Sequence, residues 1–231
     1  LLMLEICRLA KEIRPRALLI ENVPHLAGKL GFPIFEVFTR CIKRLGYKVF
    51  YKILNAADFG VPQRRQRLLI VAVDSSLKID FEFPKPEYSS HPAVGPFLKK
   101  VKCNEPDEYP NGKWGNLIRL VPPGWNYLWF TERGGGPKIF KPGSRYWIFL
   151  LKLHPKRPSW TIPARPGSYD GPFHWKGRRL KIAEVKRIQC FPDDWSLVGG
   201  KRTQWLLLGE ATPPPLAYAV GKKLAQILRG A

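Results

Sequence analysis

Residues 17–28 read ALLIENVPHLAG, and the point where their apolar run stops bears most on the fold. Residues 17–20 form a short continuous apolar run, which is typical of a parallel strand covered on both faces. The run ends at Glu21 and Asn22. Ligands of open α/β sheets bind at the carboxyl ends of strands, so Glu21 is a candidate site residue. From position alone, a helix N-cap or a surface charge explains this carboxylate equally well.

The chain around this stretch alternates between strand and helix patterns. Helical periodicity covers residues 1–13 and 35–45, and Gly46 follows the second helix as a C-terminal cap. Strand patterns cover residues 47–54 and 67–73, of which the second is a continuous apolar run. This order predicts α/β architecture for the first part of the chain.

The composition changes after about residue 80. Pro, Gly, Trp and Lys become frequent, long helical periodicity disappears, and strand patterns are short, as at residues 147–153. We expect a separate, irregular, β-containing region here. Helical patterns return at residues 182–190 and 216–228.

The charge of the chain is strongly positive. Its 231 residues include 39 Lys and Arg against 18 Asp and Glu, which gives a formal charge of +21. An excess of this size favours a polyanionic partner, most often nucleic acid. The 13% aromatic content among the basic residues favours the same partner. A membrane surface, or a basic protein with no such partner, is the alternative.

The cysteines and the apolar runs bear on metal sites, disulfides, membrane spans and the cellular compartment. The four cysteines form no Cys-x-x-Cys pair, so we expect no metal site and no disulfide framework. No apolar run approaches about 18 residues, so no membrane span is expected. We expect a reducing, cytoplasmic setting. Residue 1 is Leu and no N-cap precedes the first helical pattern, so we expect the chain to begin partway into a fold.

A basic cluster precedes the last predicted strand of the first part. Residues 55–67 read NAADFGVPQRRQR. Alternate residues of an extended chain face the same side, so Arg65 and Arg67 can point at one target. Two like charges so close favour an anion or a carboxylate between them. A solvated basic loop is the alternative, and for an arbitrary protein it is the commoner one.

These stretches resemble a known family. ENV after an apolar strand, followed by ADFGVPQRRQRLLIVAV, resembles motifs VI and VIII of the DNA (cytosine-5) methyltransferases. Residues 178–195 are similar to motif IX and residues 209–221 to motif X, in the family's order. The resemblance implies a partial Rossmann-like methyltransferase sheet and a small irregular target-recognition domain. The implied domains are residues 1–80 for the catalytic part, 81–176 for recognition, and 177–231 for a helical return to the catalytic part.

The resemblance also implies roles for single residues. Glu21 would bind the N3 edge of a flipped-out cytosine, which makes C6 open to a thiolate and C5 ready to accept a methyl group from S-adenosylmethionine. Asn22 would position the loop. Arg65 and Arg67 would hold the O2 side of the base and the nearby backbone.

The recognition region implies a double-stranded DNA partner. Basic side chains contact phosphates and guanine edges, whereas each tryptophan alone is better explained by core packing. The residues expected to contact DNA are Gln63, Arg64, Arg119, Arg133, Arg145 and Arg165.

The sequence departs from the family at several points. The family's nucleophile is a cysteine in Pro-Cys-Gln, and this sequence contains no Pro-Cys. The cofactor motif Phe-x-Gly-x-Gly is also absent, so most of the cofactor site is expected elsewhere. In motif X, Glu210 and Thr212 replace the usual asparagine and valine, and with Ala211 they are the candidate cofactor contacts in this chain.

These departures predict a partner. Without the neighbouring strand of the family's sheet, the strand at residues 17–20 becomes an apolar edge that invites pairing. We expect either a second polypeptide carrying motifs I and IV or self-association through this edge. The expected function is the target-recognition and partial catalytic portion of a DNA cytosine-5 methyltransferase. A non-catalytic DNA-binding or regulatory remnant is the alternative, and a fragment without an independent role is a third.

Overall fold

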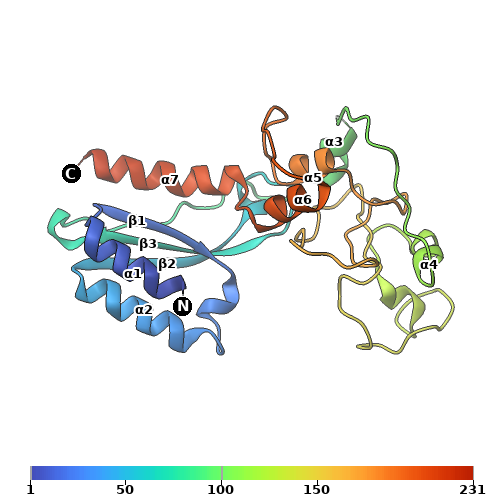
Figure 1. Cartoon of the computed structure of the whole chain (residues 1–231), viewed down its shortest axis with the longest axis horizontal. Helices are drawn as coiled ribbons and strands as arrows, with labels where there is room; N and C mark the ends of the chain where they lie inside the picture. The colour runs from blue at the N-terminus through green and yellow to red at the C-terminus, as the bar shows by residue number, and fades with distance from the viewer. Residues whose placement is uncertain (1, 100, 231) are drawn as a thin grey trace.

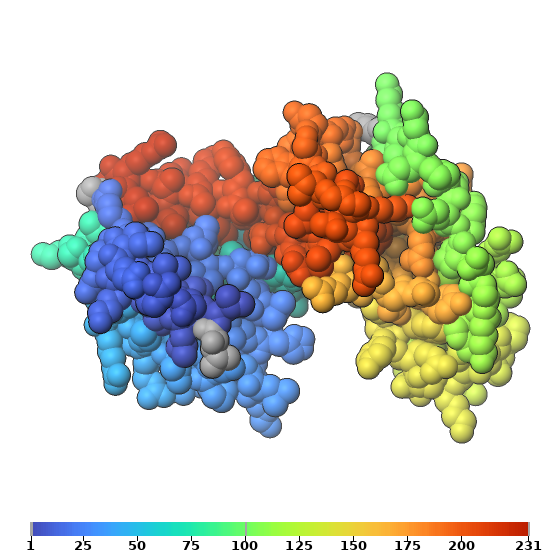
Figure 2. Space-filling view, viewed as in Figure 1, coloured from blue at the N-terminus to red at the C-terminus, as the bar shows by residue number. Residues whose placement is uncertain are grey.

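The computed structural model describes residues 2–99 and 101–230, which form two lobes along the long axis of the molecule (Figure 1). One lobe is a small sheet with helices on both faces, and the other consists of short helices and irregular chain. Figure 2 shows a notch between the lobes, with the N-terminal residues on one side and the middle of the chain on the other.

The sheet of the first lobe has three strands in the order β1-β3-β2. They are β1 (Ala17–Asn22), β2 (Tyr47–Asn55) and β3 (Gln66–Asp74), and β3 is antiparallel to both neighbours. The continuous apolar run of β3 is buried on both faces, as predicted, because successive side chains point to opposite sides. Its two faces carry Leu68, Ile70 and Ala72, and Leu69, Val71 and Val73.

Helices cover both faces of this sheet. The helices α1 (Leu2–Ile13) and α2 (Phe32–Arg44) pack on one face, and α7 (Pro214–Arg229) packs on the other (Figure 1). Gly46 follows α2 with a φ of +93°, a conformation that glycine adopts without a steric penalty. These helices confirm the predicted ones, and none in the described part of the chain is long and apolar enough to cross a membrane.

The prediction for β1 was wrong in two respects. It pairs antiparallel with β3, where the apolar run favoured a parallel strand, and it is not fully buried. The side chain of Leu19 is 42% exposed, because β1 lies at the edge of the sheet within the described residues. Four apolar residues alone do not distinguish a central parallel strand from an antiparallel edge strand.

The second lobe is built around two apolar clusters. One cluster joins the helices α3 (Val94–Lys99), α5 (Ile182–Ile188) and α6 (Lys201–Glu210) with Leu153 and Ile162. The other is rich in aromatic rings and includes α4 (Gly115–Leu120). Single 3-10 turns complete the fold, namely η1 (Pro24–Ala27), η2 (Ala56–Phe59), η3 (Ser75–Leu77) and η4 (Tyr127–Phe130).

The β structure predicted for this lobe is nearly absent. Residues 147–153 form no strand and make only isolated bridges, from Phe149 to Asp170 and from Lys152 to Phe173. Leu150 has a φ of +57°, which interrupts the extended chain. Helix α6 was not predicted. Since α7 packs on the sheet while α5 and α6 pack with α3, the division at residues 80 and 176 stays a proposal.

The tryptophans of the middle region divide into two groups. Trp114, Trp129 and Trp175 pack against the two apolar clusters, as expected of core residues. The core prediction was wrong for Trp125, Trp147 and Trp160, which are 38%, 49% and 37% exposed.

Candidate active site and nucleic-acid interface

Glu21 and Arg67 form an ion pair at one end of the sheet. Glu21 lies opposite Leu69 in the β1–β3 register, so Arg67 is its diagonal neighbour, within reach of a long side chain. The Nε atom of Arg67 lies 2.5 Å from Oε1 of Glu21, and the two side chains are only 11% and 29% exposed. Figure 1 shows that β1 runs toward the second lobe, so the pair lies on the side of the sheet that faces that lobe.

The pair is close but imperfectly hydrogen-bonded. Burial lowers the pKa of Arg67, and the nearby carboxylate of Glu21 opposes this effect. Oε1 of Glu21 is buried without a well-aligned hydrogen-bond donor among the described residues. The guanidinium of Arg67 compensates the charge of this oxygen, and a donor supplied by a bound molecule would give it a second, aligned partner.

Arg65 occupies a different position from the one expected. Its side chain is fully buried and donates to the backbone carbonyls of Ile162 at 3.2 Å and Gly209 at 2.6 Å. Burial, together with the neighbouring charge of Arg67, lowers its pKa to about 9. Arg65 therefore joins the sheet to the second lobe and does not present its guanidinium to an open target beside Arg67.

Asn22 orders the turn that follows β1. Its Oδ1 atom accepts a hydrogen bond of 2.8 Å from the backbone N–H of Val23, and its amide nitrogen lies 3.7 Å from the sulfur of Met3. The side chain thus fixes the chain direction directly after Glu21.

Gln63 was expected at the DNA but is fully buried. Its amide nitrogen donates to Oε1 of Gln189 at 3.2 Å, and its carbonyl oxygen accepts from the N–H of Ile162 at 3.1 Å. The amide of Gln189 in turn donates to the carbonyl of Leu208 at 2.6 Å. With both ends of its amide engaged inside the protein, Gln63 is a structural link between the lobes, which corrects the expectation. The adjacent Arg64 is exposed.

The arginines expected at DNA in the middle region are all exposed. Arg119 lies over the ring of Tyr109 at 5.5 Å, and Arg145 lies over the rings of Phe140 and Phe149. Arg133 and Arg165 are exposed as well. Their positions are compatible with phosphate contacts, which stay a proposal.

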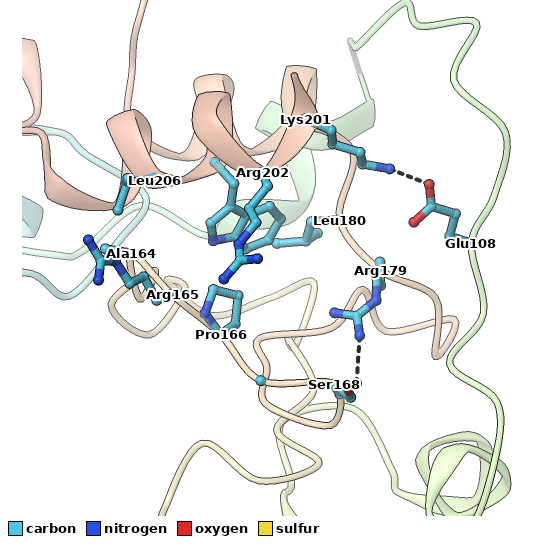
Figure 3. A pocket seen from close by; sticks show the side chains of 12 residues that line it. Glu108, Ala164, Arg165, Pro166, Ser168, Arg179, Leu180, Lys201, Arg202 and Leu206 are labelled. Carbon is cyan, nitrogen blue, oxygen red and sulfur yellow. Dashed lines mark hydrogen bonds and ion pairs between the residues drawn. The ribbon is translucent and has the colours of Figure 1, made fainter. Parts of the chain in front are cut away.

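One cavity of the second lobe is lined by several basic side chains (Figure 3). Its volume is about 510 Å³, and it lies between α6 and the segments at residues 164–168 and 179–180. Four cationic side chains line it, namely Arg165, Arg179, Lys201 and Arg202. It does not include Glu21 or Arg67 and is therefore a separate feature from the ion pair.

Two of these cations are already engaged and two are not. Lys201 pairs with Glu108, and Arg179 donates to the carbonyl of Ser168 (Figure 3). Within residues 2–99 and 101–230, neither Arg165 nor Arg202 makes a hydrogen bond or ion pair. Sequence reasoning missed Arg179, Lys201 and Arg202. The sequence contains two pairs of adjacent basic residues, at 178–179 and 201–202, but only the fold brings three of these four side chains to one cavity.

The candidate cofactor residues lie between α6 and α7. Glu210 is exposed, whereas Ala211 and Thr212 are half-buried. Helix α6 ends at Ala211, whose backbone N–H donates a hydrogen bond to the carbonyl of Leu207. The segment directly follows Gly209, whose carbonyl accepts from Arg65, so its position is tied to β3.

The sheet covered by helices and the buried carboxylate–arginine pair define an α/β protein with a recessed ionic site beside a basic lobe. The family model for C-5 cytosine-specific DNA methylase matches residues 1–226. The chain belongs to this family of C-5 cytosine-specific DNA methylases.

Curated relatives and solved structures agree with this assignment. The chain is 36% identical to the type II methyltransferase M.SacI of Streptomyces achromogenes, over 97% of this chain and 63% of that protein. It is 33% identical to M.Eco47II of Escherichia coli, over 98% and 58%. It thus spans about three fifths of the length of these relatives.

Solved structures support the fold. A DNMT2 variant of Spodoptera frugiperda matches with a TM-score of 0.64 at 14% identity, over 98% of this chain and 70% of that chain. The Entamoeba histolytica methyltransferase EhMeth matches with a TM-score of 0.59 at 15% identity, over 99% and 68%.

Proposed function

We propose that this chain is the base-holding and target-recognition portion of a DNA cytosine-5 methyltransferase. The complete activity would transfer a methyl group from S-adenosylmethionine to C5 of a cytosine extruded from double-stranded DNA. Membership of the family and the similarity to type II methyltransferases support this assignment.

The observation that carries the proposal is the buried acceptor of Glu21. Oε1 is shielded from water and lacks an aligned donor, while Arg67 holds the carboxylate in place. Cytosine offers an N4 amino donor and an N3 atom that accepts a proton, and both lie on its Watson–Crick edge. Once it has taken up a proton, Glu21 would donate it to N3 through one oxygen and accept from the N4 amino group through the other, which draws electron density from the ring.

The two arginines have separate parts in this proposal. Arg67 would contact the base through its remaining N–H groups while it orients Glu21. Arg65 is a positioning residue, because its guanidinium bonds two backbone carbonyls of the second lobe. Asn22 would hold the turn after Glu21 through its bond to Val23.

The basic lobe would hold the DNA backbone. Extruding a base costs a few kcal/mol, and phosphate contacts help to offset that cost. The charge of +21 and the unpaired guanidinium groups of Arg165 and Arg202 supply such contacts. Arg64, Arg119, Arg133 and Arg145 are further candidates, since each is exposed.

The thiol nucleophile and most of the cofactor site would come from sequence outside these residues. Burial raises the pKa of Cys7 to about 12 and that of Cys190 to about 11, whereas a nucleophilic cysteine needs a low pKa. The segment at residues 210–212 would close one side of the cofactor site, and no catalytic step is assigned to it. Within the described residues β1 pairs on one side only, so a further strand can join there.

Complementation tests this proposal. The chain is mixed with a polypeptide that carries the Pro-Cys-Gln and Phe-x-Gly-x-Gly motifs, and methyl transfer from labelled S-adenosylmethionine to DNA is measured. Glu21→Gln should lower the rate by about 100- to 10,000-fold, as loss of a positioned proton donor does. Glu82→Gln, a change at an exposed carboxylate, should leave the rate unchanged.

Two other outcomes would count against the enzyme. DNA binding without methyl transfer under every complementation would indicate a non-catalytic DNA-binding remnant. Equal rates for Glu21→Gln and the unchanged chain would remove the role assigned to Glu21.

A further inference from the structure

Two tryptophans of the second lobe form an exposed pair. The ring centroids of Trp147 and Trp160 lie 5.4 Å apart with an interplanar angle of 72°. Their side chains are 49% and 37% exposed, and neither belongs to an apolar cluster. An edge-to-face pair is a stable arrangement, so the two rings brace one another while both stay partly exposed.

Arginine side chains lie beside the Trp160 ring of this pair. The guanidinium of Arg64 lies 5.9 Å from the ring centroid of Trp160. A cavity of about 200 Å³ adjoins the ring, and Arg64, His154 and Arg157 line it. Of the described residues that line this cavity, none is acidic. An aromatic face bordered by arginines suits a ligand that combines a flat ring with negative charge.

The pair is fastened to the segment that leads to the candidate active site. The N–H of Arg64 donates to the carbonyl of Ser159 at 2.8 Å, and the hydroxyl of Thr161 donates to the carbonyl of Arg64 at 2.8 Å. Arg64 and Arg67 are three residues apart, so at the rise of an extended chain their Cα atoms lie roughly 10 Å apart. At about 3.4 Å per nucleotide along one strand, the two sites lie within about three nucleotides of one another.

We propose that Trp147, Trp160 and Arg64 form a stacking site for a nucleotide that flanks the extruded cytosine. The flanking base stacks on the exposed part of the Trp160 ring, beside the guanidinium of Arg64, and Trp147 supports that ring from one side. Arg64 and Arg157 hold the phosphate of the same nucleotide. This inference rests on the proposed function, because Glu21 and Arg67 place the cytosine from which the spacing is counted.

The chemistry favours a nucleotide over a protein partner. A protein–protein hot spot has its tryptophan in a desolvated apolar pocket with a polar rim, whereas here arginines border the ring itself. Stacking on an aromatic ring tolerates any base, so the site would add affinity and hold the strand open without reading sequence.

Measurements of DNA-binding affinity test the stacking site. The probe is a short mixed-sequence duplex with one cytosine opposite an abasic site, which lowers the cost of extrusion. Trp160→Ala should weaken binding by about 5- to 100-fold, and Trp160→Phe should restore most of it. Trp195→Ala is the matched control, because Trp195 is 53% exposed and packs on Phe191, away from this cavity.

A second probe makes the assignment specific. Its nucleotides next to the cytosine are also abasic, so there is no flanking base to stack. The unchanged chain should lose affinity for this probe, whereas Trp160→Ala should bind both probes equally, since the same contact has already been removed.

The possible failures are distinguishable. If Trp160→Ala, folded by circular dichroism, prefers the first probe as strongly as the unchanged chain does, the stacking site is wrong and the DNA function stands. If the unchanged chain binds neither probe, the proposed function fails and the stacking site fails with it.

Discussion

The folded chain should lose stability in mild acid because of one buried histidine. His174 is 4% exposed, its ring stacks on Trp175 at 3.8 Å, and its Nδ1 atom accepts from the backbone N–H of Lys176. Burial lowers its pKa from 6.5 to about 4, and the positive charge of Arg178 acts in the same direction. Lys176 also lowers this pKa, while Glu184 and Asp107 raise it.

The sign and the size follow from proton linkage. Between pH 6.5 and about 4, the unfolded chain binds a proton at His174 that the folded chain excludes. The contribution to stability is complete above pH 6.5 and is lost as the pH falls toward about 4. At about 1.4 kcal/mol for each pH unit of difference, the loss amounts to about 3 kcal/mol.

Urea unfolding followed by tryptophan fluorescence at several pH values measures this loss. His174→Asn keeps an acceptor near the position of Nδ1 but does not titrate. Its unfolding free energy should therefore fall less steeply below pH 6.5, by up to about 1.4 kcal/mol per pH unit. His25→Asn, at an exposed histidine, should keep the steep dependence. Parallel curves for the unchanged chain and His174→Asn would refute the reasoning, whatever their absolute stabilities.

Four further results are expected. Glu184→Ala should lower the unfolding free energy in urea by up to about 3–5 kcal/mol, because it removes two bonds of 2.7 Å from the buried Arg178 and leaves it the partly exposed Asp107 as its ion-pair partner. Gly209→Ala should cost about 1–3 kcal/mol in the same assay, since a Cβ atom there would lie 2.4 Å from facing backbone. Gly221→Ala, in a helix with nothing within 4 Å, should instead stabilise by about 0.5–1 kcal/mol. Arg202→Ala should make the plot of log affinity for DNA against log salt shallower by about 1, and an unchanged slope would exclude a phosphate contact.

The sequence predicted the sheet lobe best because its signals are local. The continuous apolar run of β3 predicts a buried strand, and the glycine after α2 predicts a helix end. Each signal lies within a few residues, and both predictions are confirmed. Helix α6 gave no such signal. Its buried residues are only Leu208 and Gly209, so no apolar stripe appears in its sequence. Leu150 likewise gave no warning of the positive φ that prevents a strand.

The candidate site was predictable where its contacts lie in one sheet and not where they cross between lobes. The resemblance placed Glu21 and Arg67 on one target, and the structure brings their side chains together. The acceptors of Arg65 are carbonyls 97 and 144 positions away in the chain. Side-chain pattern carries no information about such backbone partners, so the burial of Arg65 could not be anticipated.

Residues 63–67 both join the sheet to the second lobe and supply the arginine of the ion pair with Glu21. Gln63 and Arg65 point inward and bind the second lobe through Gln189, Ile162 and Gly209. Arg67, at the next inward position, reaches the ion pair with Glu21. Because one extended segment carries all three residues, any shift of the second lobe against the sheet must strain the buried amide and guanidinium bonds before it moves the ion pair. Under the proposed function, this single segment would set the spacing between a DNA strand at the second lobe and a base at Glu21.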